Sequence, residues 1–153
     1  SAHSANGPWA RISTARPARS SRGRRAMMPA TLPLLRGYVI TARNSKVAEA
    51  RGRDLGIPVF IGAKDKLAQV RLLCEEMDIQ LHQVAFMGDD LPDLVALRAV
   101  GLAVAPANAH HWIAERVHWQ TTGKGGKGAA RELCDLLLDA QGHTEALLAE
   151  QTA

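Results

Sequence analysis

The first third of this chain lacks acidic residues: residues 1–48 contain nine Arg or Lys and no Asp or Glu. Residues 49–153 instead hold fifteen acidic and ten basic side chains, so the net charge of +4 describes no single surface. Aromatic residues make up only 4% of the sequence, and Trp9 is the one aromatic among the N-terminal charges. The charge of this basic segment would attract polyanions, but without aromatic stacking partners we do not expect it to bind nucleic acid.

Cysteine is also scarce, and long apolar stretches are missing. Cys74 and Cys134 lie sixty positions apart with no CxxC or histidine spacing, which excludes a disulfide framework and gives no zinc pattern. We expect two reduced thiols in a cytoplasmic protein. No stretch approaches the roughly 20 apolar residues that span a bilayer, and no secretory signal is recognisable, so we expect no membrane association.

Changes in composition and apolar pattern divide the sequence into three parts. Residues 1–37 consist largely of Ala, Arg, Ser and Pro without a helical or strand period, and we expect a disordered or non-native segment. Residues 38–142 form the expected domain, and residues 143–153 a C-terminal tail. In the domain, apolar runs at 38–40, 59–61, 84–87, 101–105 and 117–120 alternate with helical stretches at 45–55, 65–77, 91–98, 109–116 and 129–140. This alternation predicts an α/β fold with a parallel sheet covered on both faces.

Polar side chains follow three successive strands of this sheet. Ligands bind at the carboxyl ends of parallel strands, where the loops converge. The residues at these ends are Thr41, Arg43 and Ser45, then Lys64 and Lys66, then Asp89, Asp90 and Asp93. Clustered carboxylates repel one another unless they share a cation, and their oxygens suit Mg²⁺, so we predict a metal site at Asp89 and Asp93. The alternatives are structural, because Asp89 or Asp90 could cap the next helix and Ser45 could cap its own.

The order of hydroxyl, lysine and aspartate cluster resembles the phosphatases of the haloacid dehalogenase (HAD) superfamily. Among these, the segments "VITARNSKVAEARGRDLGI", "KDKL", "VAFMGDDLPDL", "VGLAVAPANAH" and "GGKGAARELCDLLLDAQG" are similar to the type that hydrolyses 3-deoxy-D-manno-octulosonate 8-phosphate (KDO 8-phosphate). The resemblance implies a capless, Rossmannoid three-layer fold, a Mg²⁺ cofactor, a phosphorylated sugar acid as substrate, and a role in lipopolysaccharide biosynthesis. Family members are homotetramers, but the hairpin that helps to assemble them has no counterpart here.

The resemblance also implies roles for individual residues. Thr41 would hydrogen-bond the transferring phosphoryl group, Lys66 would offset its charge, and Asp89 would bind Mg²⁺. Arg43 and Arg51 would hold the anionic substrate, for which a forked guanidinium is well suited. For Arg51, a solvated helix face is the structural alternative.

The chain departs from the family at its nucleophile. These phosphatases use a DxDG motif on the first strand, in which the first aspartate attacks phosphorus and the second transfers protons. This chain has no Asp before Asp54 and no apolar strand in residues 1–30. We therefore expect a sheet that lacks its first strand and a phosphatase that is inactive or severely impaired. A shifted or misassembled reading frame is our hypothesis for residues 1–37, with a transit peptide as the alternative. A non-catalytic phosphosugar- and metal-binding remnant and a related sugar-acid phosphatase remain alternative functions.

Overall fold

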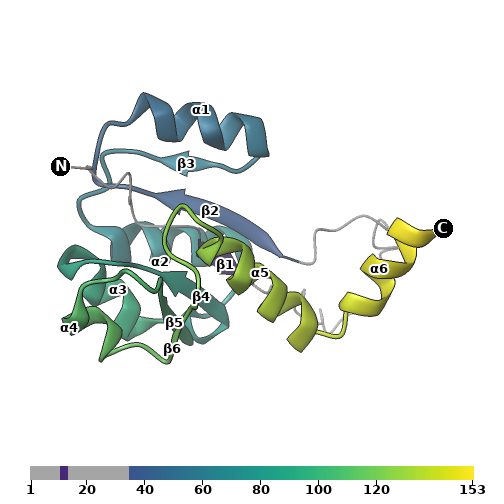
Figure 1. Ribbon diagram of the computed structural model, residues 1–153. Coiled ribbons are helices and arrows are strands. Elements are labelled where there is room, and N and C mark those ends of the chain that lie inside the picture. The colour runs from purple at the N-terminus through teal and green to yellow at the C-terminus, as the bar shows by residue number, and fades with distance from the viewer. Residues whose placement is uncertain (1–10, 14–34) are drawn as a thin grey trace, which may run out of the picture.

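The computed structural model describes residues 11–13 and 35–153, which form one sheet with helices on both faces (Figure 1). The strand order is β3-β2-β1-β4-β5-β6. The pairs β2–β3, β4–β5 and β5–β6 are parallel, which confirms the predicted α/β fold. The strands are β1 (Arg11–Ser13), β2 (Arg36–Ile40), β3 (Val59–Phe60), β4 (Val84–Met87), β5 (Leu102–Ala105) and β6 (Trp119–Gln120).

The helices follow the strands as the sequence predicts, and capping side chains define where several of them begin. Ser45 Oγ accepts from the Ala48 amide, so the capping alternative is confirmed for this residue. Asp65 caps the next helix in the same way through the Ala68 amide. The helices are α1 (Lys46–Leu55), α2 (Lys66–Met77), α3 (Leu94–Ala99), α4 (His111–Ala114), α5 (Ala129–Ala140) and α6 (Thr144–Thr152), with 3₁₀ turns η1 (Leu81–Gln83) and η2 (Leu91–Asp93).

Strand β4 shows why the molecule has three layers. All four of its residues are buried, and successive side chains point to opposite faces of the sheet. Val84 and Phe86 belong to the core cluster that α2, α3 and α4 cover. Ala85 and Met87 belong to a second cluster that α5 covers. A strand buried on both faces must be apolar throughout, which is why this one is recognisable in the sequence.

The centre of the sheet requires a correction to the expected missing strand. Strand β1 lies between β2 and β4 and pairs antiparallel with both, with Ile12 opposite Gly37 and Ala85. Without a partner there, backbone groups of β2 and of the fully buried β4 would be unsatisfied. Three residues of the N-terminal segment meet that need although their sequence has no apolar pattern. The segment predicted to be disordered or non-native also ends too late, because Arg36 and Gly37 already belong to β2. Residues 1–10 and 14–34 of that segment lie outside the described residues.

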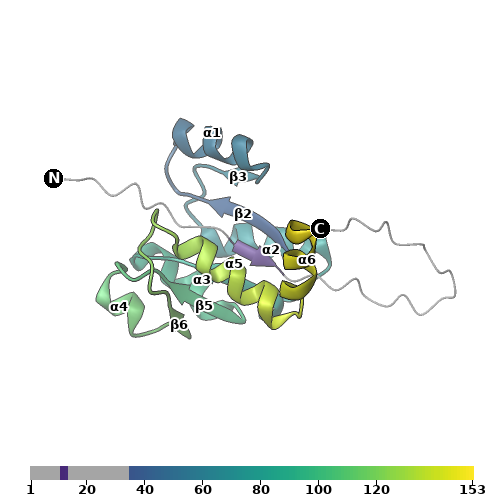
Figure 2. The same cartoon turned by 45° about the vertical axis from the view of Figure 1, so that its right-hand side comes forward.

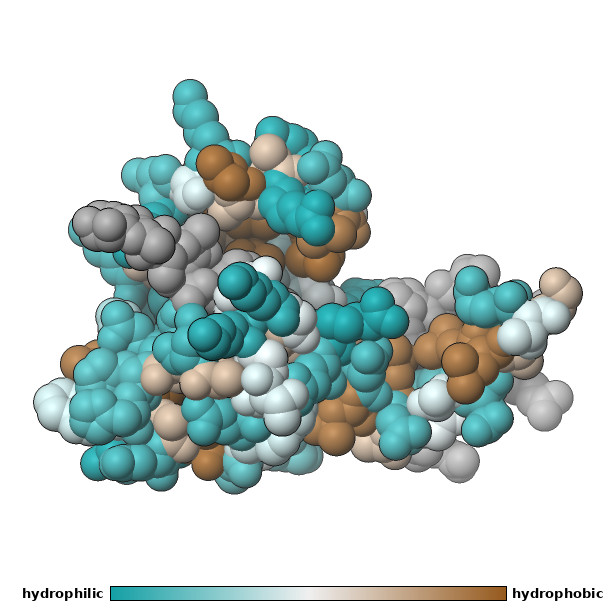
Figure 3. Space-filling model, viewed as in Figure 1, coloured by the Kyte–Doolittle hydropathy of each residue, from teal (hydrophilic) through white to brown (hydrophobic). Residues whose placement is uncertain are grey.

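The C-terminal residues form a helix where the sequence analysis expects a tail. Helix α6 contacts α5 and lies at the end of the molecule where β2 begins (Figure 2). Apolar surface is visible over α6, where Leu147 and Leu148 are 38% and 57% exposed (Figure 3). Among the helices of the described residues, none has the length and apolar character required to cross a membrane.

Candidate functional site

Asp93 forms hydrogen bonds to several of the polar groups around the end of β4. Its side chain is almost fully buried, and its Oδ1 accepts from Lys66 Nζ at 2.5 Å. Its Oδ2 accepts from the backbone amides of Asp89 at 3.0 Å and Asp90 at 3.2 Å. One carboxylate therefore fixes both the ammonium at the start of α2 and the turn that leaves β4. A carboxylate offers about four lone-pair positions, so Oδ1 keeps one free.

Gly88 makes this arrangement possible because it lets Asp93 lie directly against the backbone. A Cβ atom at position 88 would lie 2.5 Å from Asp93 Cβ and 2.8 Å from its Cγ. No side chain fits in that space. The glycine of the "GDDLPD" stretch is therefore required by a close approach.

Asp89 forms no ion pair with a side chain in the part of the chain that the structure describes. It is half-buried, and burial raises its pKa to about 6, with the neighbouring charges of Asp93 and Asp90 adding to the shift. Its own backbone hydrogen bond and the more distant Lys66 oppose the shift only in part. A carboxylate in this state gains more than an ordinary one from a bound cation. Asp90 accepts from the Leu91 amide and caps η2, which confirms the capping alternative for this residue.

The second group of predicted residues lies at the end of β2. Thr41 is buried, and its Oγ1 accepts from the Arg43 amide at 3.2 Å, which leaves its O–H free to donate. The Arg43 side chain is exposed beside it, and Arg51 is exposed on α1. Among the described residues, no hydrogen bond or ion pair joins Thr41, Arg43 or Arg51 to Asp89. The structure thus brings Lys66, Asp89 and Asp93 together and places Thr41 and Arg43 at the same edge of the sheet.

The described side chains could hold a metal ion only in part. No group of three or more His, Cys, Asp or Glu in residues 35–153 is arranged around a common point. Asp89 and Asp93 are two carboxylates at one strand end, and Mg²⁺ commonly takes one or two carboxylates and completes its shell with water and phosphate. Of the two, Asp93 is already bonded to Lys66 and is almost fully buried, so Asp89 is the more accessible carboxylate.

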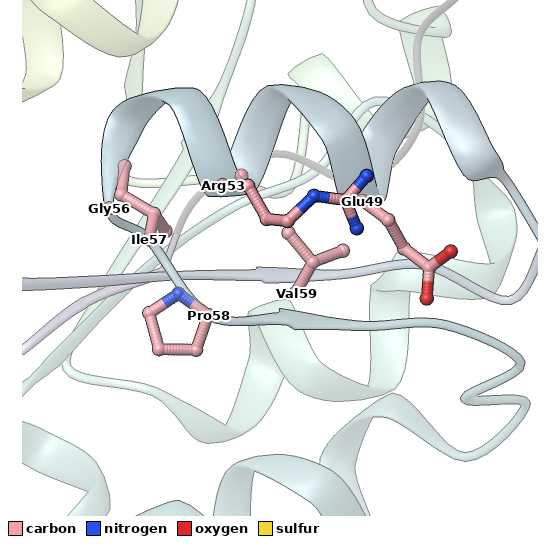
Figure 4. Close-up of a pocket in the computed structure, with 7 residues that line it drawn as sticks. Glu49, Arg53, Gly56, Ile57, Pro58 and Val59 are labelled. Carbon is pink, nitrogen blue, oxygen red and sulfur yellow. The ribbon is translucent and has the colours of Figure 1, made fainter.

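A hollow beside α1 lies away from these residues. Its lining comes from the C-terminal half of α1 and the residues leading into β3, with Glu49 and Arg53 at its side (Figure 4). It lies where β3 begins, whereas Thr41, Lys66 and Asp89 follow the carboxyl ends of strands. The hollow is therefore not part of the predicted site.

The sequence analysis overlooked two contributors to the strand ends. The His110 amide donates to the Asp89 carbonyl at 2.9 Å. Glu132, near the start of α5, accepts from the amides of Thr122 and Gly123, which lie in the glycine-rich loop of residues 121–128. The sequence does hold a signal for the role of Glu132. Helix α5 begins after Gly128, which has no side chain to cap the helix, and Glu132 is the acidic residue of its first turn.

A family model matches the part of the chain that contains these residues. The family model for haloacid dehalogenase-like hydrolases matches residues 52–133, which include Lys66, Asp89 and Asp93. The chain belongs to this family. A 3-deoxy-D-manno-octulosonate 8-phosphate phosphatase from Yersinia pestis is 44% identical over 108 residues, which are 70% of this chain and 58% of that protein. The chain thus spans less than two thirds of this haloacid dehalogenase-like relative.

Solved structures of haloacid dehalogenase-like proteins match the fold. A hypothetical protein from Xanthomonas campestris is 59% identical with a TM-score of 0.74, over 76% of this chain and 64% of that one. A 3-deoxy-D-manno-octulosonate 8-phosphate phosphatase from Moraxella catarrhalis, in complex with a magnesium ion, a phosphate ion and KDO, is 37% identical with a TM-score of 0.70. This match covers 74% of the present chain and 66% of the Moraxella chain.

Proposed function

We propose that this chain carries the metal- and phosphate-binding part of a phosphatase site for a phosphorylated sugar acid of the KDO 8-phosphate type. The observation that carries the proposal is the group Lys66, Asp93 and Asp89 at the end of β4, within the segment that resembles phosphatases of that name. In this proposal the protein is a cytoplasmic member of the lipopolysaccharide pathway.

Each residue has a role that follows from its surroundings. Asp89 and Asp93 would hold Mg²⁺, which when bound neutralises phosphate charge. The buried ammonium of Lys66, fixed by Asp93, would offset negative charge on the phosphoryl oxygens. Thr41 would donate its free O–H to one of those oxygens. Arg43 and Arg51, both exposed, would reach the anionic groups of the substrate.

The nucleophile is the missing part of the mechanism. In the family resemblance, an aspartate on the central strand attacks phosphorus. The central strand here is Arg11–Ser13, and the chain has no aspartate before Asp54. We therefore propose that this polypeptide binds Mg²⁺ and phosphosugar but turns the substrate over slowly or not at all.

Two alternatives remain in the same framework. A non-catalytic phosphosugar- and metal-binding protein is favoured by the composition of β1. A related sugar-acid phosphatase is equally compatible with Thr41, Lys66 and Asp89, because none of these residues contacts the sugar in the proposal. Homotetramer formation, against which the missing hairpin argues, and the expected absence of nucleic-acid binding both stay predictions. Residues 1–10 and 14–34 of the basic segment lie outside the described residues.

Calorimetric titration tests the proposal directly. The chain should bind Mg²⁺, and in its presence KDO 8-phosphate, while Asp89→Ala should weaken Mg²⁺ binding at least about 10-fold. Arg51→Ala should weaken substrate binding, and Arg53→Ala, an equally exposed arginine of α1, is the matched control. Failure of the wild-type chain to bind either ligand would reject the proposal.

A further inference from the structure

The loop between β6 and α5 is held by more contacts than its sequence suggests. Residues 121–128 read Thr-Thr-Gly-Lys-Gly-Gly-Lys-Gly, and glycine at this density leaves a chain little conformational preference. Gly126 and Gly128 both have positive φ, at 72° and 97°. The loop therefore needs external partners to keep one conformation.

Glu132 supplies the main external contact. Its Oε1 accepts from the Thr122 amide at 3.0 Å, and its Oε2 accepts from the Gly123 amide at 3.0 Å. The Thr122 hydroxyl donates to the same carboxylate at 3.1 Å. The two backbone amides hold the pKa of Glu132 below its usual value, so the charged form is the one that binds the loop.

From this anchor, hydrogen bonds continue toward Asp89. The Gly123 carbonyl accepts from the Ala107 amide at 3.0 Å. Farther along the loop, the Gly125 amide donates to Asn108 Oδ1 at 2.8 Å. Residues 106–110 are thereby tied to the loop, and the His110 amide at their end donates to the Asp89 carbonyl at 2.9 Å. Three consecutive loops at the carboxyl edge of the sheet are connected in this way.

We propose that Glu132 is a positioning residue for the Asp89 site, acting through the 121–128 loop and residues 106–110. This inference rests on the proposed function of Asp89 in metal binding. Glu132 touches no substrate in this account. Its carboxylate fixes the glycine-rich loop, the loop fixes residues 106–110, and these hold the backbone on which the Asp89 carboxylate is carried. The same contacts keep Lys124 and Lys127 at the edge where an anionic substrate would enter.

Two variants and a control test this role. Glu132→Ala removes all the contacts, and Glu132→Gln keeps one acceptor oxygen but sets its NH₂ group against the second amide. Asp135→Asn, one turn farther along α5, is the matched control, because Asp135 is exposed and, within the described residues, pairs only with Arg131 at 2.9 Å. Amide hydrogen exchange at Thr122, Gly123 and His110 is measured together with Mg²⁺ affinity.

The expected pattern separates positioning from loop anchoring. In Glu132→Ala, exchange should rise at Thr122 and Gly123 and also at His110, and Mg²⁺ affinity should fall about 10-fold, as for other residues that orient a metal ligand. The exchange rates and the Mg²⁺ affinity of Glu132→Gln should lie between those of Glu132→Ala and the wild type. Both quantities in Asp135→Asn should match the wild type. Faster exchange at Thr122 and Gly123 with unchanged His110 and Mg²⁺ affinity would overturn the proposal.

The exchange data also distinguish this proposal from the one on which it rests. A wild-type chain that binds no Mg²⁺ would refute the proposed function. In that case, His110 exchange in Glu132→Ala still decides whether Glu132 positions the Asp89 backbone: faster exchange supports it, and unchanged exchange refutes it.

Discussion

The charged form of Asp89 destabilises the folded state, because the side chain is partly buried. Its pKa of about 6 in the folded chain lies above the ordinary 3.8, so the folded state binds this proton more tightly than the unfolded state. Stability from this group is complete at low pH, falls between about pH 4 and 6, and stays low above pH 6. Without metal, Asp89→Asn should therefore raise the free energy of unfolding at pH 8 by about 1–2 kcal/mol, after discounting for solvent at a half-exposed side chain.

Urea unfolding of Asp89→Asn and wild type at pH 8 and pH 4 measures this effect. The difference should be much smaller at pH 4, where Asp89 of the folded wild type is mostly protonated and neutral, as Asn is. An Asn variant with the same advantage at both pH values would show that charge burial is not the cause.

Substitution of Gly88 tests whether Asp93 needs to lie directly against the backbone at this position. In Gly88→Ala, the added methyl group would overlap Asp93 and force the turn after β4 to shift, which should cost about 1–3 kcal/mol. Gly37→Ala in β2 is the control, because the nearest atom to its methyl group would be Ile57 Cδ1 at 3.8 Å. Equal stabilities of the two variants in urea unfolding would contradict this role for Gly88.

Among the elements, the pair of Lys66 and Asp93 joins the starts of α2 and α3 to the end of β4. Both side chains are at least 95% buried, so removal of one partner leaves an uncompensated buried charge. Asp93→Ala and Lys66→Met should each cost about 3–5 kcal/mol. Arg131→Ala breaks an exposed pair and should cost less than about 1 kcal/mol. The free energy of unfolding of each variant is measured in urea. Losses of similar size in all three variants would contradict the claim that the buried pair stabilises the fold more than the exposed pair does.

The elements also show what the sequence can and cannot predict. Val84–Met87 was predicted with its observed bounds, because a strand buried on both faces is apolar at every position. Strand β1 was missed, since its place between β2 and β4 follows from tertiary pairing and not from its residues. Lys66 and Asp93 were both selected as site residues, but their mutual contact, 27 positions apart in the chain, is visible only in the fold. Glu132 was missed because its contacts depend on how the glycine-rich loop returns to α5.

At the scale of the whole molecule, the sheet depends on a very short central strand. A variant without residues 1–34 removes β1 and leaves β2 and β4 with unpaired backbone groups in the middle of the sheet. Each lost backbone hydrogen bond costs about 1 kcal/mol, so the loss should reach at least about 3 kcal/mol, or the exposed edges should drive association. Urea unfolding and size-exclusion chromatography measure both outcomes. A truncated chain with unchanged stability and elution would show that β1 contributes nothing.

The measurement that tests the central claim most directly is Mg²⁺-dependent phosphate release from KDO 8-phosphate by the purified chain, with Asp89→Ala beside it. The account predicts that the wild type binds the substrate but releases no more phosphate than the variant, because β1 supplies no carboxylate nucleophile. Mg²⁺-dependent release that disappears in Asp89→Ala would contradict the account and would mean that another group of this chain attacks phosphorus.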